Sequence, residues 1–200
     1  LPSLSQSLLP RVTTRFLSSR PNVSVFVQSL PSRQVADLVA PRPFDIGLIE
    51  LPMAGPSISV EPLVPARSVA VIPANHRLAS KKQISVKDLA GERMVLLSQH
   101  SFLRYQIDDA FSKLGVVPHV VLETPHSNIA CAFAAAGAGI TLVSHWAAES
   151  FSGPNVVVRP VKEELTSRSA IIFPYPGARL MLAEAFAKEI KEEIRQFKQR

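Results

Sequence analysis

Cysteine and aromatic residues are scarce in this 200-residue chain, and their scarcity excludes several classes of protein. The single cysteine, Cys131, cannot form a disulfide within the chain, so no disulfide framework marks an oxidising compartment. No stretch of about 18 uncharged apolar residues occurs, which argues against a membrane-spanning helix. The first twenty residues lack the order of a signal peptide. We therefore expect a globular cytoplasmic protein with no membrane partner.

Motifs for catalysis and metal binding are also missing. The five histidines do not have the spacing of a metal site. No Gly-x-Ser-x-Gly turn is present to expose a nucleophilic serine. The pair Gly137 and Gly139 follows a helical segment and precedes a strand, which reverses the order of a dinucleotide fingerprint. We predict that the chain is not an enzyme and needs neither a cofactor nor a metal.

The net charge of +6 leaves two interpretations open, a nucleic-acid surface or a mildly basic soluble surface. The basic residues are dispersed, and aromatic residues, at 6% of the chain, are too few for base stacking. The densest basic cluster, residues 188–200, also contains three glutamates, as a solvated helix face does. The second interpretation is favoured.

Strands alternate with helices along most of the chain, which predicts an α/β fold with parallel, doubly wound sheets. A first helix is expected over residues 3–19, kinked or restarted at Pro10. A strand is expected over residues 23–27, and Ser32 is expected to cap the next helix. A long final helix is expected from residue 176 to about 199. About ten strands in 200 residues fit two small sheets better than one.

Residues 123–144 carry the most information. They read as a strand end, a polar loop, a small-residue helix, a glycine stop at Gly137 and a buried strand. The helix start leaves the backbone N–H groups of Ser127 and Asn128 exposed, and such groups suit a small polar or anionic molecule. The uncharged helix is either wholly buried or part of a subunit seam.

Four serine-bearing segments are each expected to open a helix, near Ser3, near Ser32, at residues 98–101 and at residues 124–128. In open α/β sheets, ligands lie outside the carboxyl ends of strands near helix starts. Any one of these segments is explained more simply as a helix cap, whereas all four together favour a cleft. Glu50 ends a buried strand, and it is either a partner for a cationic ligand group or an exposed loop carboxylate.

The order of five motifs resembles the effector-binding domain of LysR-type transcriptional regulators, from residue 1 to about 185. The motifs are Leu-Leu-Pro at 8–10, Phe-Asp-Ile-Gly-Leu at 44–48, Val-Ala-Val-Ile-Pro at 69–73, Ile-Ser-Val-Lys-Asp-Leu-Ala at 84–90 and Ala-Ala-Gly-Ala-Gly-Ile-Thr-Leu-Val at 135–143. One departure is Ser144, where many members have proline, which leaves the local turn open.

This resemblance implies a two-lobed type 2 periplasmic-binding-protein-like fold with two crossovers. It places lobe I at residues 1–72 plus 156–200 and lobe II at residues 73–155, with a small-molecule effector held between them. It also implies an antiparallel homodimer through the first helix and the alanine-rich helix 127–137, and a tetramer at full length. The family's winged helix-turn-helix is expected upstream and is absent from this sequence, so DNA would be bound only through that missing domain.

Residues 44–52 further resemble regulators that sense amino acids or opines, such as those of nopaline and octopine catabolism. Glu50 would then suit an ammonium or guanidinium group, and the helix starts would suit carboxylates. Alternatives are a solute-binding protein of a transport system, a regulator of aromatic or organic acids, and a small hydrolase or transferase. The candidate ligand-binding residues are Ser3, Ser5, Glu50, Pro52, Ser98, Gln99, His100, Ser101, Phe102, Thr124, His126 and Ser127.

Overall fold

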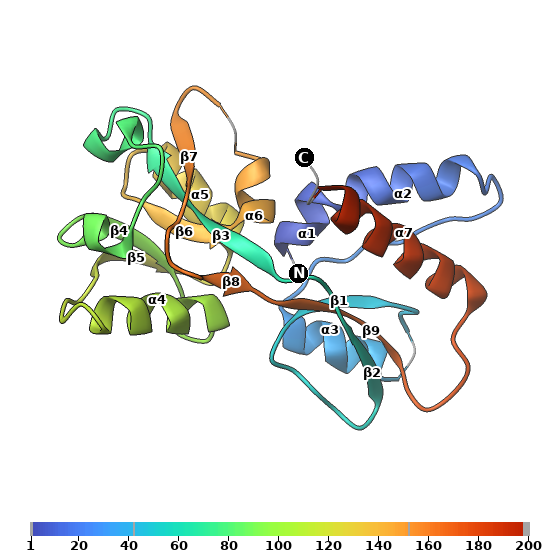
Figure 1. Cartoon of the computed structure of the whole chain (residues 1–200). Helices are drawn as coiled ribbons and strands as arrows, with labels where there is room; N and C mark the ends of the chain where they lie inside the picture. Colours follow the sequence, from blue (N-terminus) through green and yellow to red (C-terminus); the bar gives the residue numbers. More distant parts are fainter. Residues whose placement is uncertain (1, 42, 152, 198–200) are drawn as a thin grey trace. The chain divides into compact units, whose positions relative to one another are not determined.

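The computed structural model describes residues 2–41, 43–151 and 153–197, which form a mixed α/β fold (Figure 1). The chain divides into two compact units, Leu1–Pro65 with Arg168–Arg200, and Ala66–Ser167. These boundaries differ from the predicted lobes. Residues 66–72 and 156–167 belong to the second unit because β3 (Ala66–Pro73) pairs with β6 (Thr141–Ser144), β7 (Val156–Pro160) and β8 (Thr166–Ser167).

The first unit contains a sheet with the strand order β1–β9–β2, where β1 is Gly47–Glu50, β2 is Ile58–Pro62 and β9 is Ser169–Pro174. Both outer strands run antiparallel to β9. Helix α3 (Ser32–Val39) packs on this sheet through Val39, which is buried with Ile49 and Ile172. The approach is close, because a Cβ atom on Gly47 would lie 2.7 Å from Val35.

Two consecutive helices replace the single first helix, α1 (Pro2–Ser7) and α2 (Leu9–Ser18). The predicted restart at Pro10 is confirmed, since a proline in the first turn of a helix gives up an N–H that has no helical partner. Phe16 of α2 meets Phe186 of α7 (Met181–Phe197) edge to face, with ring centroids 5.0 Å apart. Helix α7 begins at Met181 rather than at 176, and its predicted end near 199 lies outside the described residues.

Two other local predictions for the first unit are wrong. Residues 23–27 do not form a strand, although their sequence alternates as strands do. Ser32 does not cap α3, because Pro31 occupies the N-cap position and the Ser32 hydroxyl instead accepts a hydrogen bond from the Glu50 N–H at 2.9 Å.

The second unit contains a sheet in which β3 lies between β6 and β7, with every pairing antiparallel. The expected parallel pairing is found between β4 (Arg93–Leu97) and β5 (His119–Thr124). Parallel pairing as a general rule is therefore wrong. Strand β3 carries the chain into this unit and β7 leads it back, so the two run in opposite directions.

Helices α4 (Phe102–Ser112), α5 (Ser127–Ala135) and α6 (His145–Glu149) complete the second unit, with short 3₁₀ turns η1 (Arg77–Ser80) and η2 (Val86–Leu89). Gly137 ends the α5 region with φ of +84°, as predicted. The predicted buried strand is β6, and all four of its residues are buried. Ser144, the departure from the family pattern, caps α6 by accepting a hydrogen bond from the Ala147 N–H. No helix in the described ranges is long and apolar enough to span a bilayer.

Candidate functional site

The carboxyl ends of β4 and β5 lie side by side in the second unit, and each leads into a helix. The Ser98 N–H donates to the Thr124 carbonyl at 3.0 Å, so the two following loops start next to each other. The first loop enters α4 at Phe102, and the second enters α5 at Ser127. The structure thus brings together the predicted residues of this unit, Ser98, Gln99, His100, Ser101, Phe102, Thr124, His126 and Ser127.

Both helix starts present backbone amides. The N-cap residues are Ser101 for α4 and His126 for α5, and neither side chain makes a capping hydrogen bond. The Thr124 hydroxyl accepts instead from the His126 N–H at 3.3 Å, which fixes the turn before α5. The first amides of a helix have no partner inside the helix and lie at the positive end of its dipole. They can therefore bind a carboxylate or another small anion.

A buried guanidinium, which the sequence analysis missed, holds the base of these loops. Arg104 is only 6% exposed, and its Nη1 donates to the Leu97 carbonyl at 2.8 Å. The same side chain pairs with Asp108, one helical turn further along α4, and with Glu123 of β5. Burial lowers the pKa of Arg104, but the hydrogen bonds to the two carboxylates outweigh it and leave the pKa above its usual value. The spacing of Arg104 and Asp108 by four residues was the signal in the sequence.

The predicted residues of the first unit lie on its own elements. Ser3 and Ser5 are inside α1 rather than in a loop before it, and the Ser3 carbonyl accepts from the Ser7 hydroxyl at 2.9 Å. Glu50 is the half-buried last residue of β1, and Pro52 is exposed in the loop that follows. Their contribution to ligand binding stays a prediction.

The lone thiol lies in the core of the second unit. Cys131 is fully buried in α5, and burial raises its pKa to about 12. A thiol with that pKa stays protonated near neutral pH and is a poor nucleophile. Packing therefore accounts for Cys131. Within the described ranges no cluster of three or more histidine, cysteine, aspartate or glutamate side chains is placed to hold a metal ion.

Known proteins share this architecture. Among solved structures, the BenM effector-binding domain with its effector benzoate has a TM-score of 0.77 and 22% identity, covering 98% of this chain and 87% of that one. The effector-binding domain of QuiR in complex with shikimate has a TM-score of 0.79 and 17% identity, covering 97% of this chain and 93% of that one. At these identities the likeness shows the fold alone.

Sequence relatives are transcriptional regulators. The regulatory protein NocR of Agrobacterium tumefaciens strain T37 is 29% identical over 189 residues, which are 94% of this chain and 63% of NocR. The transcriptional activator LysR of Escherichia coli K12 is 28% identical over 191 residues, which are 96% of this chain and 61% of that protein. The chain thus spans less than two thirds of these relatives. Residues 1–195 match the family described as LysR substrate binding domain, and the chain belongs to that family.

Proposed function

We propose that this chain is the effector-sensing domain of a LysR-type transcriptional regulator, and that it binds its effector at the paired helix starts of the second unit. One observation carries the proposal: two helices of 11 and 9 residues begin side by side, at the carboxyl ends of adjacent parallel strands. Binding would change how a DNA-binding domain elsewhere in the longer protein engages its operator. A ligand produces such a change only if it binds one arrangement of the protein better than another.

The effector that we propose is a small amino-acid-like carboxylate or an opine. Exposed amides at the start of α5 suit a carboxylate. The octopine catabolism and uptake operon regulator OccR of Rhizobium meliloti is 27% identical over 192 residues, 94% of this chain and 62% of OccR, which favours an opine. Glu50 supplies the negative charge that a guanidinium or ammonium group would need.

We further propose that the domain forms a homodimer through α5 and a tetramer at full length. The outer face of α5 exposes Ile129 and Phe133, each 39% accessible, together with Ala132 and Ala136. Apolar surface of this kind favours a subunit contact. Support for the first helix is weaker, because the stripe of Leu4, Leu8, Val12 and Phe16 is already buried within its own unit.

Titration calorimetry tests the effector. The purified chain would be titrated with octopine, arginine, glutamate and benzoate. Saturable binding of octopine, arginine or glutamate supports the proposal. Binding of benzoate alone would favour a sensor of aromatic acids. If none of these molecules binds, and none raises the melting temperature of the folded chain, the amino-acid-like effector is wrong.

Sedimentation velocity tests the dimer. Phe133→Asp would place a charge on the outer face of α5 and is expected to yield monomers. Tyr105→Asp is the matched control, because Tyr105 is 66% exposed on α4, outside the proposed seam. Equal dissociation by both variants would contradict a contact specific to α5.

A further inference from the structure

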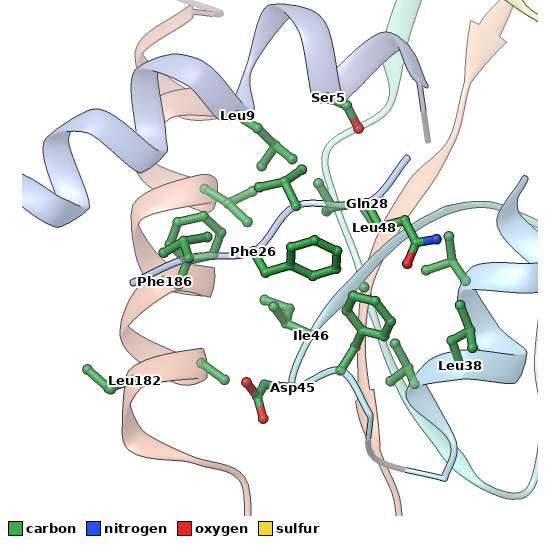
Figure 2. Close-up of a pocket in the computed structure, with 18 of the residues that line it drawn as sticks. Ser5, Leu9, Phe26, Gln28, Leu38, Asp45, Ile46, Leu48, Leu182 and Phe186 are labelled. Atoms are coloured by element: carbon green, nitrogen blue, oxygen red, sulfur yellow. The ribbon is translucent and has the colours of Figure 1, made fainter. Parts of the chain in front are cut away.

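A largely apolar cavity of about 390 Å³ lies inside the first unit, in a place separate from the effector site (Figure 2). Leu38 of α3 lines it from one helix, and Leu9 of α2 and Phe186 of α7 line it from two others. Residues 23–28 and residues 46–48 complete the wall, the latter leading into β1. The cavity is therefore enclosed by helices and by two extended segments of chain.

The surroundings of the cavity are those of a strand position in a layered α/β fold. In such folds helices cover both faces of a sheet. Strand β1 is the end strand of the order β1–β9–β2, and the cavity touches β1 through Gly47 and Leu48. On its other side lie residues 23–28, which reach β1 through α3, as a strand does in a strand–helix–strand unit. The sheet would continue across the cavity to residues 23–28 if one strand lay between them.

Residues 23–28 have the sequence of a strand but not its hydrogen bonds. The run Val-Ser-Val-Phe-Val-Gln alternates apolar and polar side chains at its start, and β-branched and aromatic residues favour strands. Among the described residues, no hydrogen bond is formed by the backbone groups of residues 24–28. Phe26 is 77% exposed and Val27 is 48% exposed, both unusually high for large apolar side chains. A missing pairing partner explains all three features.

We propose that the cavity is the seat of one further β-strand, which inserts between residues 23–28 and β1. In a longer polypeptide that carries this domain, the strand would come from residues joined to the amino end of α1. Ser5 of α1 lines the cavity and lies beside it in Figure 2, so a short turn joins such a strand to that helix. NocR, of which this chain spans 63%, shows that such longer polypeptides exist.

The cavity also sets the chemistry of its occupant. Helices on both faces require apolar side chains on both sides of the strand, as in buried strands of parallel sheets. At about 3.3 Å per residue, the four residues of β1 and the six residues of 23–28 correspond to a strand of roughly four to six residues. Asp45 is the one charged side chain of the lining and is exposed, so nothing inside the cavity selects an ionic ligand.

Two extended versions of the chain test the proposal. The first adds Val-Ile-Val-Ile-Gly-Ser before Leu1, and the control adds Val-Pro-Val-Pro-Gly-Ser, whose prolines cannot donate hydrogen bonds. Hydrogen exchange measured by mass spectrometry would follow the amides of residues 24–28. The strand extension is expected to slow their exchange about tenfold or more and to raise the melting temperature by several degrees, whereas the proline extension should do neither. Equal exchange in both versions would overturn the proposal.

A pair of valines sharpens the test. Val27 lines the cavity and is 48% exposed, and Val64 lies outside it and is 42% exposed. In the strand-extended chain, Val27→Asp should abolish the slower exchange, and Val64→Asp should leave it intact. Two results would contradict a strand supplied by the same chain. One is equal protection by added dodecanoate, which would indicate a lipid site. The other is protection that grows with protein concentration, which would indicate a strand from a second copy.

Discussion

The side-chain amide of Gln106 pairs with the backbone of Thr166 through two hydrogen bonds. Its Nε2 donates to the Thr166 carbonyl at 2.7 Å, and its Oε1 accepts from the Thr166 N–H at 3.0 Å. Gln106 lies on α4, whose first turn borders the effector site, and Thr166 lies on β8, the last strand before the chain leaves the second unit. A movement of α4 on ligand binding would therefore be felt directly at β8.

Gln106→Ala should lower the free energy of unfolding by about 1–3 kcal/mol, because it leaves a half-buried N–H and carbonyl of Thr166 without partners. Urea unfolding measures the loss. Gln34→Ala, which removes an exposed glutamine from α3, is the control and should cost less than about 0.5 kcal/mol. A loss no larger than that of the control would show that the pair contributes little.

Arg104→Met should cost about 1–3 kcal/mol and weaken effector binding. The Leu97 carbonyl would lose its donor, and the loop 98–101 would lose its anchor. The cost should stay below the 3–5 kcal/mol typical of a broken buried pair, because Asp108 and Glu123 are 42% and 43% exposed and can regain water.

Lys113→Met is the matched control for Arg104, since Lys113 pairs with Asp109 on the same helix but is 74% exposed. Its cost should be below about 0.5 kcal/mol. Unfolding and calorimetry together would separate the two roles of Arg104. Normal effector affinity in a folded Arg104→Met protein would refute the anchoring role.

The capping box of η2 should make the second unit sensitive to acid. A hydrogen bond from Lys81 lowers the pKa of Asp88 from 3.8 to about 2, helped by the backbone N–H of Ser85. Because the folded-state pKa is depressed, the stabilisation is complete above about pH 4 and is lost as the pH falls toward about 2.

Asp88→Asn should therefore lower stability by about 1–2 kcal/mol at pH 7, a value reduced for partial exposure, and by almost nothing at pH 2. Thermal unfolding over this pH range provides the measurement. Asp109→Asn, in an exposed pair with Lys113, should show little difference at either pH. A difference for Asp88→Asn that does not shrink in acid would contradict the assigned cause.

Two neighbouring glycines should respond differently to alanine. A Cβ on Gly139 would lie 2.5 Å from the Arg93 carbonyl oxygen, which is part of the backbone and accepts from the Ile140 N–H. Gly137 has open space around its Cβ position but a φ of +84°. Gly137→Ala should cost about 1 kcal/mol for the left-handed backbone, and Gly139→Ala should cost more, about 2–4 kcal/mol. Equal melting temperatures for the two variants would count against the close packing of residue 139 on β4.

Local signals in the sequence were sufficient where the cause is local. Pro10, the Ser85 and Asp88 pair and Gly137 each determine the backbone within a few residues, and the structure confirms all three. The side-by-side loops after β4 and β5 also followed, because a polar loop between a strand and a helix has a fixed place in an α/β layer.

Predictions that depend on distant partners did less well. Residues 23–27 have strand propensity but no strand beside them, and propensity alone does not make a ladder. Ser32 looked like a helix cap, but the Glu50 N–H, 18 residues away, binds its hydroxyl. Arg104 was missed because its burial between β4 and β5 is a property of the tertiary structure.

The most direct test of the account replaces one backbone N–H at the start of α5. Ser127 is the first residue of α5 and follows His126, whose φ of −119° and ψ of 122° are compatible with a following proline. Ser127→Pro removes the amide and should leave the melting temperature of the chain almost unchanged, whereas Ser127→Ala keeps the amide and removes only the hydroxyl. With the effector identified by calorimetry, the account predicts that Ser127→Pro weakens binding at least about tenfold and that Ser127→Ala weakens it less. Unchanged affinity in a folded Ser127→Pro protein would contradict the claim that the start of this helix binds the effector.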